Sequence, residues 1–277
     1  RSPRFTGEAR WRLPGGEAVP ARLAGAWGNG RLRLQAGLGE TRPLQLELDL
    51  WPETGAYAAR LRSARADLAA LGGLPAALAA LGSLALPARL QGALTADLAL
   101  SGRGGGLAGL RGGGTLRAEG LGVPGRLPAG LLEARLQAGG PHLVLEAFRL
   151  SLPAGEVRAR GTLGLADGSF RVPLEAAVQG AGEFAAGFGW RGVGGRGSLR
   201  GELRGTREAP AFQGRLRWAD PRLGRHALDL LEGEVEIRPR ALASPHLLLR
   251  RGGTTAILRG TLTAPGRTPL RALDPAR

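Results

Sequence analysis

The stretch EVRARGTLGLADGSFRVPLEAAV, residues 156–178, alternates between apolar and polar residues almost without a break. In its first half Val157 and Leu163 fall on one parity, and Arg158 falls on the other; after an Asp-Gly dipeptide the alternation restarts at Phe170. A period of two predicts β-strands that have one apolar face and one charged face. What the protein does therefore depends on what the apolar face contacts.

The same alternation recurs along the chain, so we predict a nearly all-β fold. Further strands are expected at PLQLELDL (43–50), ALTADLAL (93–100), LLEARLQ (131–137) and GEVEIR (233–238). The dipeptides Asn29-Gly30 and Asp167-Gly168 predict tight hairpins between strands. Pro173 cannot donate to a strand ladder, so we expect it at a sheet edge or a bulge.

One segment departs from this pattern. Residues 68–88 carry no charge, and their leucines recur at spacings of three and four, which is typical of a helix with one apolar stripe. Gly72-Gly73, Pro75 and Gly82 interrupt the segment, and these interruptions argue against a membrane span. We predict one or two short amphipathic helices near residues 66–84.

Composition narrows the possible functions. The chain has no cysteine, which excludes a disulfide scaffold and thiolate metal sites. Its net charge is +15, and all 38 basic residues are arginine, spread along the strands instead of clustered. Aromatic residues make up 4%, too few for a run of base-stacking platforms, so we expect no nucleic-acid partner. Because the chain also lacks methionine, we expect it to be a segment of a longer protein.

Short internal sequence similarities predict repeated structural units. FTGEARW (5–11) resembles FQGRLRW (212–218), and RGTL occurs at 160–163 and again at 259–262. The offsets, 212 − 5 = 207 and 259 − 160 = 99, fit units of roughly a hundred residues. We predict three groove repeats: 1–90, with the leucine-rich segment at its end, 91–195, and 196–277, truncated at its C-terminal end.

Residues that could support catalysis do not converge in the sequence. His142, His226 and His246 lack metal-ligand spacing to one another or to a nearby acidic pair. GGGLAG (104–109) satisfies the dinucleotide-binding glycine pattern, but a turn and a strand follow it where that motif requires a helix. We predict that the chain is not an enzyme and has no cofactor, no catalytic residues and no metal site.

Two arrangements could hide the apolar faces. One is a closed β-sandwich or solenoid, which would make the chain a structural or adhesive module without a lipid ligand. The other is an elongated, curved single-sheet groove, which the few aromatics and the repeats favour. A fully buried Leu or Val contributes about 1.5–3 kcal/mol, so an open groove would need apolar guests, and acyl chains fit such a trough.

Three stretches together resemble the repeat of the TamB family, within the AsmA-like group. They are GALTADLALSG (92–102), GGTLRAEGLGVPG (113–125) and LLEARLQAGGPHLVLEAFRLSLPAGEVRARGTLGL (131–165). In that family a G-x-L-x-x-x-L-x-L-x-G strand follows a leucine-rich stretch, and hairpins end in G-x-[LV]-x-x-x-G-x-[LI]. The ending occurs here at Gly155, Val157, Gly161 and Leu163, with a looser copy at Gly253, Gly260 and Leu262. The resemblance covers most of residues 1–265, but the second copy departs in the RGTREAP loop and lacks the leucine-rich segment before it.

The resemblance implies a taco-shaped β-groove that spans the periplasm of a diderm bacterium. Such a protein would be held by an inner-membrane anchor outside this segment. Family members carry phospholipid toward the outer membrane and take part in outer-membrane assembly with a barrel partner. The expected ligands are therefore phospholipid acyl chains, in a periplasmic segment of an inner-membrane-anchored protein.

The resemblance also implies which side chains contact the lipid, by hydrophobic contact alone. These are the apolar-face residues Leu44, Leu46, Leu48, Leu50, Leu94, Leu98, Leu132, Leu136, Val157, Leu163, Phe170, Val172, Leu174, Val178, Leu216, Trp218, Val235 and Ile237.

Overall fold

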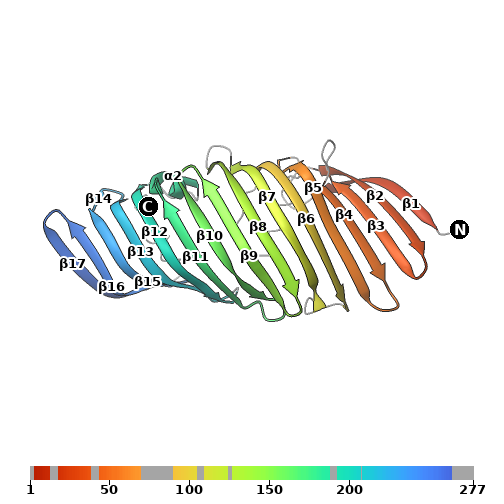
Figure 1. Ribbon diagram of the computed structural model, residues 1–277. Helices are drawn as coiled ribbons and strands as arrows, with labels where there is room; N and C mark the ends of the chain where they lie inside the picture. Colours follow the sequence, from red (N-terminus) through yellow and green to blue (C-terminus); the bar gives the residue numbers. More distant parts are fainter. Residues whose placement is uncertain are drawn as a thin grey trace. The chain divides into compact units, whose positions relative to one another are not determined.

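The computed structural model describes residues 3–12, 18–38, 44–69, 90–104, 109–123, 127–187, 192–206 and 208–263. Within these residues the fold is nearly all β, as predicted: 17 strands belong to one open antiparallel sheet (Figure 1). The chain divides into two compact units. Unit 1 comprises Arg1–Pro124, Ala129–Phe148 and Leu163–Asp167, and unit 2 comprises Gly125–Pro128, Arg149–Thr162 and Gly168–Arg277.

The strands follow one another along the chain as a meander. They are β1 (Arg4–Arg12), β2 (Ala18–Gly28), β3 (Arg31–Leu38), β4 (Leu44–Trp51), β5 (Ala56–Asp67), β6 (Gln91–Arg103), β7 (Arg111–Val123), β8 (Leu127–Gly139) and β9 (His142–Leu152). Then come β10 (Gly155–Gly164), β11 (Phe170–Val178), the helix α2 (Ala181–Gly187), β12 (Val193–Gly205), β13 (Pro210–Leu223), β14 (His226–Ala227), β15 (Leu230–Arg238), β16 (Ala241–Arg251) and β17 (Thr254–Thr263).

Turn chemistry explains the hairpin between β2 and β3. Gly28 pairs with Arg31, which leaves Asn29 and Gly30 as the two central residues of the turn. Their φ angles are 52° and 67°, the left-handed conformation that a two-residue type I′ turn requires and that Asn-Gly adopts most readily. The prediction of a tight hairpin at this dipeptide is confirmed.

Pro173 does not lie where the sequence suggested. It pairs with Glu202 in an unshifted register between β11 and β12, and β11 lies between β10 and β12 in the sheet. The expectation of a sheet edge was therefore wrong, and the pairing of β11 with β12 contains no bulge at Pro173.

A bulge in β5 shifts the register where unit 1 buries its core. The extra residue, Arg65, has a φ of 108°, and the pairing with β6 shifts between Ala64 and Ala66. The buried Ser63 hydroxyl donates to the carbonyl of Leu94 at 2.9 Å and accepts from the backbone N–H of Ala66 at 2.8 Å. A side chain thus supplies hydrogen bonds at a point where the ladder is interrupted.

The predicted helices lie mostly outside the described residues. At the start of the predicted range, Ala66 and Asp67 still belong to β5, and Leu68 and Ala69 form a turn; residues 70–89 are not described. The helix α2, which the sequence did not predict, follows β11 in unit 2. Among the described residues, no helix is long and apolar enough to cross a membrane. The three predicted repeats stay a prediction, since the division into two units rests on contacts and not on sequence similarity.

The tightest packing of unit 1 lies at one end of its strands. Leu44, Ala66, Leu68 and Ala118 form a buried cluster, against which half-buried leucines of neighbouring strands pack. We call this the cluster end of unit 1. The opposite end, which carries the Asn29-Gly30 turn and the turn between β4 and β5, is called the hairpin end.

Candidate functional site

The strand register of unit 1 brings apolar residues into continuous rows on one face. Paired residues of an antiparallel sheet point to the same side, so the register assigns each side chain to a face. One such row runs Leu23–Ala36–Leu46–Leu61–Leu98 across β2 to β6. We call this side the apolar face of unit 1.

Neighbouring rows have the same character. A second row runs Gly25–Leu34–Leu48–Ala59–Leu100, and a third runs Trp27–Leu32–Leu50–Tyr57–Gly102. None of these three rows contains a charged residue, so the apolar face of unit 1 is continuous over β2 to β6.

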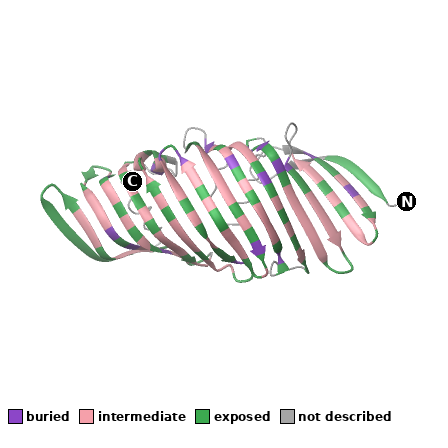
Figure 2. Ribbon diagram, viewed as in Figure 1, coloured by how far each residue is buried: buried purple, intermediate pink, exposed green. Residues whose placement is uncertain are grey.

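Burial on this face changes abruptly along β2 and β4. At the cluster end Ala21 and Leu44 are 2% and 3% exposed, but two residues further along the same strands Leu23 and Leu46 are 37% and 39% exposed. Figure 2 shows exposed and half-buried positions alternating along the strands, with few buried residues. The described part of unit 1 contains no helix, and all its strands belong to the one sheet, so no described element covers this face.

Two aromatic rings on the apolar face of unit 1 lie over glycines of the adjacent strand. Phe5 of β1 lies over Gly25 of β2, and Tyr57 of β5 lies over Gly102 of β6, its Oη 2.5 Å from where a Cβ would lie. A glycine beside an aromatic residue lets the ring cover the backbone of the neighbouring strand. Phe5 and Tyr57 thus each reach across to the neighbouring strand of the sheet.

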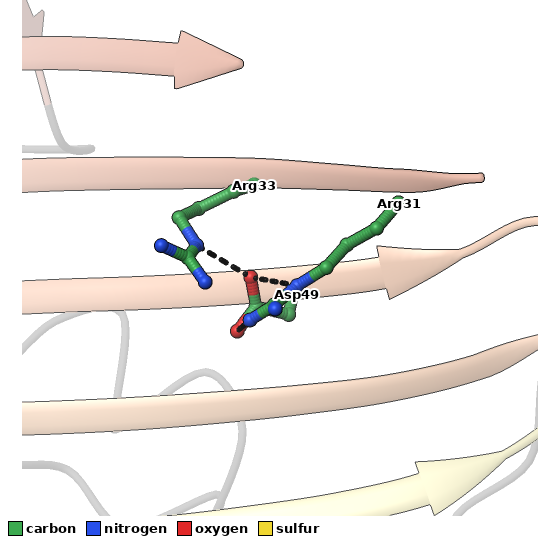
Figure 3. Close-up of polar contacts among 3 residues, drawn as sticks. All are labelled: Arg31, Arg33 and Asp49. Carbon is green, nitrogen blue, oxygen red and sulfur yellow. Dashed lines mark hydrogen bonds and ion pairs between the residues drawn. The ribbon is translucent and has the colours of Figure 1, made fainter. Parts of the chain in front are cut away.

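The opposite face of unit 1 carries the charges, and many of them are paired. Arg31 and Arg33 both donate to Asp49, at 2.8 Å from Arg31 Nε and 3.1 Å from Arg33 Nε to Oδ1 (Figure 3). These hydrogen bonds, the one from Arg31 above all, hold the pKa of Asp49 below its ordinary value. The guanidinium of Arg31 also lies 5.0 Å from the ring centre of Trp51, a cation–π contact on the same side.

Further ion pairs continue this charged face across the sheet. Arg60 and Arg62 lie beside Asp97, and Arg117 bridges Glu119 and Glu133 at 3.0 and 3.1 Å. These pairs lie on the charged face that the period-two alternation predicts. The carboxylates therefore neutralise arginines and do not converge on a reaction centre.

Unit 2 has an apolar face of the same construction. One row runs Val172–Leu203–Phe212–Ile237–Leu242, and a parallel one runs Ala176–Leu199–Leu216–Gly233–Leu247. Two further rows, described with the predicted residues below, complete the face. On the reverse side Arg171 donates to Glu202 at 2.8 Å, and this hydrogen bond raises the pKa of Arg171.

All the predicted lining residues of unit 2 share its apolar face. Leu174 lies in the row Leu174–Gly201–Gly214–Val235, Val178 and Trp218 lie in the row Val178–Gly197–Trp218–Leu231, and Phe170 pairs with Gly205. Gly155 and Gly161 lie against the backbone of Val178 and Val172 respectively, which puts Val157 on the same side. Leu216, Val172 and Ile237 belong to the rows above.

The predicted residues of unit 1 fall on its apolar face wherever their contacts fix it. Leu44, Leu46, Leu48 and Leu50 alternate with the charged residues of β4, and Leu94 and Leu98 pair with Ala66 and Leu61. Leu132 packs against the buried cluster, and Leu136 is four residues further along β8 on the same parity. Leu163, 37% exposed, belongs to unit 1 as well.

Exposure separates these residues into two groups. Leu44 and Val235 are buried, so they serve packing and are not available to a ligand. Leu46 and the other half-exposed positions can contact a ligand on the apolar face.

The sequence prediction omitted several residues of both faces. These are Leu32, Leu34, Tyr57, Leu61, Leu100 and Leu116 in unit 1, and Leu199, Leu203, Phe212 and Leu231 in unit 2. Period-two alternation was present at most of these positions. It identifies a face within a strand, but only the register shows which strands place their faces together.

The described residues offer no candidate metal site. Among them, no three His, Asp or Glu side chains lie close enough together to hold a metal ion. A hollow of about 600 Å³ over β1 to β4 is lined mainly from the charged face, by Thr6, Glu8, Arg22 and Gln35 among others. It is therefore separate from the apolar rows, apart from Leu23, Ala36 and Leu46 along its floor.

In comparisons with models of protein families, with curated proteins and with solved structures, nothing matched the chain.

Proposed function

We propose that the apolar faces of this chain bind phospholipid acyl chains, and that the chain is a segment of a TamB-like lipid-transfer bridge across the periplasm. One observation carries the proposal. Across β2 to β6 the apolar face is uninterrupted by charge, and at Leu23, Trp27 and Leu46 it is between 37% and 43% exposed. No described element of unit 1 lies over it.

The unfavourable free energy of exposing this apolar face to water favours a bound apolar ligand. Each Å² of apolar surface removed from water contributes about 25 cal/mol, so rows of half-exposed leucines leave stabilisation unrealised. Monomeric proteins seldom keep continuous apolar patches larger than a few hundred Å² without a binding role. A flexible hydrocarbon chain can cover such a face, because it needs no hydrogen-bond partner and adapts its conformation to the surface.

The charged reverse face supports the same assignment. Its arginines and carboxylates pair across strands, as Arg60 does with Asp97 and Arg171 with Glu202. Such a face remains in water while the apolar face holds lipid. Movement of phospholipid between membranes, outer-membrane assembly with a barrel partner, and an inner-membrane anchor outside the chain all belong to this proposal through the family resemblance.

Adjacent positions of β4 provide the test, because Leu48 and Glu47 point to opposite faces. The chain has no cysteine, so Leu48→Cys and Glu47→Cys each create a single attachment point for a benzophenone crosslinker. We expect that illumination with vesicles of phosphatidylethanolamine and phosphatidylglycerol crosslinks phospholipid at position 48 and not at position 47. Mass spectrometry of the adducts gives the readout.

Other outcomes would contradict the proposal. Equal crosslinking at both positions would indicate non-specific association with the vesicle surface. No lipid adduct at position 48 in a variant with native circular dichroism would favour the structural or adhesive module, in which another protein surface covers the face.

A further inference from the structure

Two strands of the sheet, β1 and β17, have an open edge. Among the described residues, β1 pairs with β2 alone and β17 pairs with β16 alone (Figure 1). β17 is ten residues long and carries one charge, Arg259, so it lacks the lysines and prolines that usually protect an edge strand. Phe5 of β1 is 54% exposed, and Ile257 and Leu258, which point to opposite faces of β17, are each 52% exposed. Both edges can therefore accept a further strand.

The sequences of these two edge strands match those of two strands that are neighbours inside unit 2. In β1, FTGEARW (5–11) shares its Phe, Gly, Arg and Trp positions with FQGRLRW (212–218) of β13. In β17, LRGTL (258–262) is identical to LRGEL (199–203) of β12 at four of its five positions. β12 and β13 pair with each other. The two open edges thus carry the two sequences that the chain already pairs internally.

Inside unit 2, this pairing leaves no room for a side chain at its central glycines. Gly201 of β12 lies opposite Gly214 of β13, and a Cβ added to either glycine would come within 2.7 Å of the Cα of the other. The corresponding glycines at the edges are Gly260 of β17 and Gly7 of β1, and neither has a described atom within 4 Å of that position. The space that the neighbouring strand fills in the interior is open at both edges.

β10 provides an independent case of the same packing. Its RGTL segment (160–163) repeats residues 259–262 of β17. A Cβ added to Gly161 would lie 2.7 Å from the Cα of Val172 in β11, so this glycine also lies against the strand that follows. The R-G-x-L pattern is therefore covered by a next strand in β10 and in β12, and β17 is the copy that has no described strand on that side.

From these matches we propose that β17 of one copy of the chain pairs with β1 of a second copy, in the antiparallel register that joins β12 to β13. This register sets the following residues opposite one another: Leu262 and Phe5, Thr261 and Thr6, Gly260 and Gly7, Arg259 and Glu8, Leu258 and Ala9. Each copy offers one β17 edge and one β1 edge, so the association is head to tail and does not stop at a dimer. The inference does not depend on lipid binding.

Charge at the two edges suits this pairing. In unit 2 the register places two like charges, Arg200 and Arg215, opposite one another. At the edges the same register places Arg259 opposite the carboxylate of Glu8, and opposite charges on facing strand positions are favourable. Glu8 has one long contact, 3.9 Å to Arg22, and its side chain is 84% exposed, so it remains accessible to a residue of a second copy.

Disulfide formation between two variants measures the register. Thr6→Cys and Thr261→Cys are made separately in the cysteine-free chain, mixed without lipid and mildly oxidised. Opposed residues of antiparallel strands have Cα atoms about 4.5–5.5 Å apart, which a disulfide spans. Thr263→Cys is the matched control, because it lies on the same strand face but diagonally across from Thr6, at about 7–8 Å. We expect Thr6→Cys to form several-fold more heterodimer with Thr261→Cys than with Thr263→Cys.

Light scattering of the lipid-free chain measures the association itself. The native chain should show a mass that rises with concentration beyond that of a dimer. Gly7→Val adds a side chain where the free chain has open space, so the variant should fold, and it should stay monomeric because Gly260 of the second copy comes too close. Gly139→Val is the control, since Gly139 also has open space but ends β8, and it should associate like the native chain.

Other outcomes would overturn the inference. A native chain that stays monomeric at all concentrations would show that a second copy does not occupy the β17 edge. Dimers of Thr261→Cys alone, without heterodimers with Thr6→Cys, would show that β17 pairs with itself. Equal crosslinking of Thr6→Cys to positions 261 and 263 would show association without the predicted register. Because lipid is absent from both experiments, none of these results bears on the proposed function.

Discussion

The ring of Phe212 in β13 lies across Gly201 in β12, with its Cζ 2.7 Å from the point that a Cβ on Gly201 would occupy. The same Cζ lies 2.7 Å from the corresponding point on Gly214. One aromatic ring thus covers two glycines, which accounts for part of the high glycine content of the strands. We expect Gly201→Ala to force the ring and the backbone apart and to lower the free energy of unfolding by about 1–3 kcal/mol.

Urea unfolding followed by circular dichroism measures this cost. Gly7→Ala is the control, since Gly7 also lies in a strand opposite Leu23 but has open space where a Cβ would be added. Its effect should stay within about 0.5 kcal/mol. Equal effects of the two substitutions would mean that the ring does not depend on the glycine beneath it.

Leu44 and Leu46 lie on the same face of β4, but we expect a charged substitution to affect folding at Leu44 and lipid binding at Leu46. Leu44→Asp places an unpaired carboxylate in the buried cluster and should cost several kcal/mol, enough to unfold or nearly unfold the chain. Leu46→Asp places the carboxylate at a half-exposed position, so the variant should fold and lose bound phospholipid. Circular dichroism and lipid analysis of the purified proteins separate the two effects. Unfolding by Leu46→Asp would indicate that this position is core in solution.

The pairing of Asp49 with Arg31 and Arg33 predicts a pH dependence of stability. Its pKa is lowered in the folded chain, so the folded state binds the proton less readily than the unfolded state. The contribution of ionised Asp49 to the free energy of unfolding is present above the ordinary aspartate pKa of about 4. It is lost as the pH falls through the lowered pKa. Asp49→Asn should therefore differ most from the native chain near neutral pH and converge with it under acid.

A pH series of urea midpoints for the two proteins provides the measurement. Asp97→Asn is the comparison, because the Asp97 side chain is 62% exposed and lies 3.4 and 3.8 Å from its arginines. It should change stability less at neutral pH. A constant difference between native chain and Asp49→Asn across the acid range would contradict the assignment.

The hydroxyl of Ser63 should contribute more to the stability of the folded chain than the hydroxyl of Ser151. Ser63→Ala removes both hydrogen bonds at the β5 bulge and leaves the buried N–H of Ala66 without its partner, at a cost of about 1–3 kcal/mol. The Ser151 hydroxyl is buried and has no hydrogen-bond partner among the described residues, so Ser151→Ala should be neutral or slightly stabilising. Thermal unfolding of both variants tests the pair, and a larger loss for Ser151→Ala would refute it.

The sequence alone determined the fold class and the two faces of each strand. Side chains alternate strictly along a strand, so the spacing of Leu44, Leu46, Leu48 and Leu50 was sufficient to place them on one side. The turn at Asn29-Gly30 could also be predicted from the sequence, because few dipeptides adopt two consecutive left-handed backbone conformations. These are local properties, fixed within a few residues of chain.

The tertiary structure decided everything that depends on neighbours distant in sequence. Leu44 and Leu46 have the same residue type, strand and face, yet one is buried and the other open, because only Leu44 belongs to the buried cluster with Ala66, Leu68 and Ala118, which are distant in sequence. The interior position of Pro173 and the bulge at Arg65 likewise follow from strand register. Alternation specifies which way a side chain points, and the register between strands decides what it meets there.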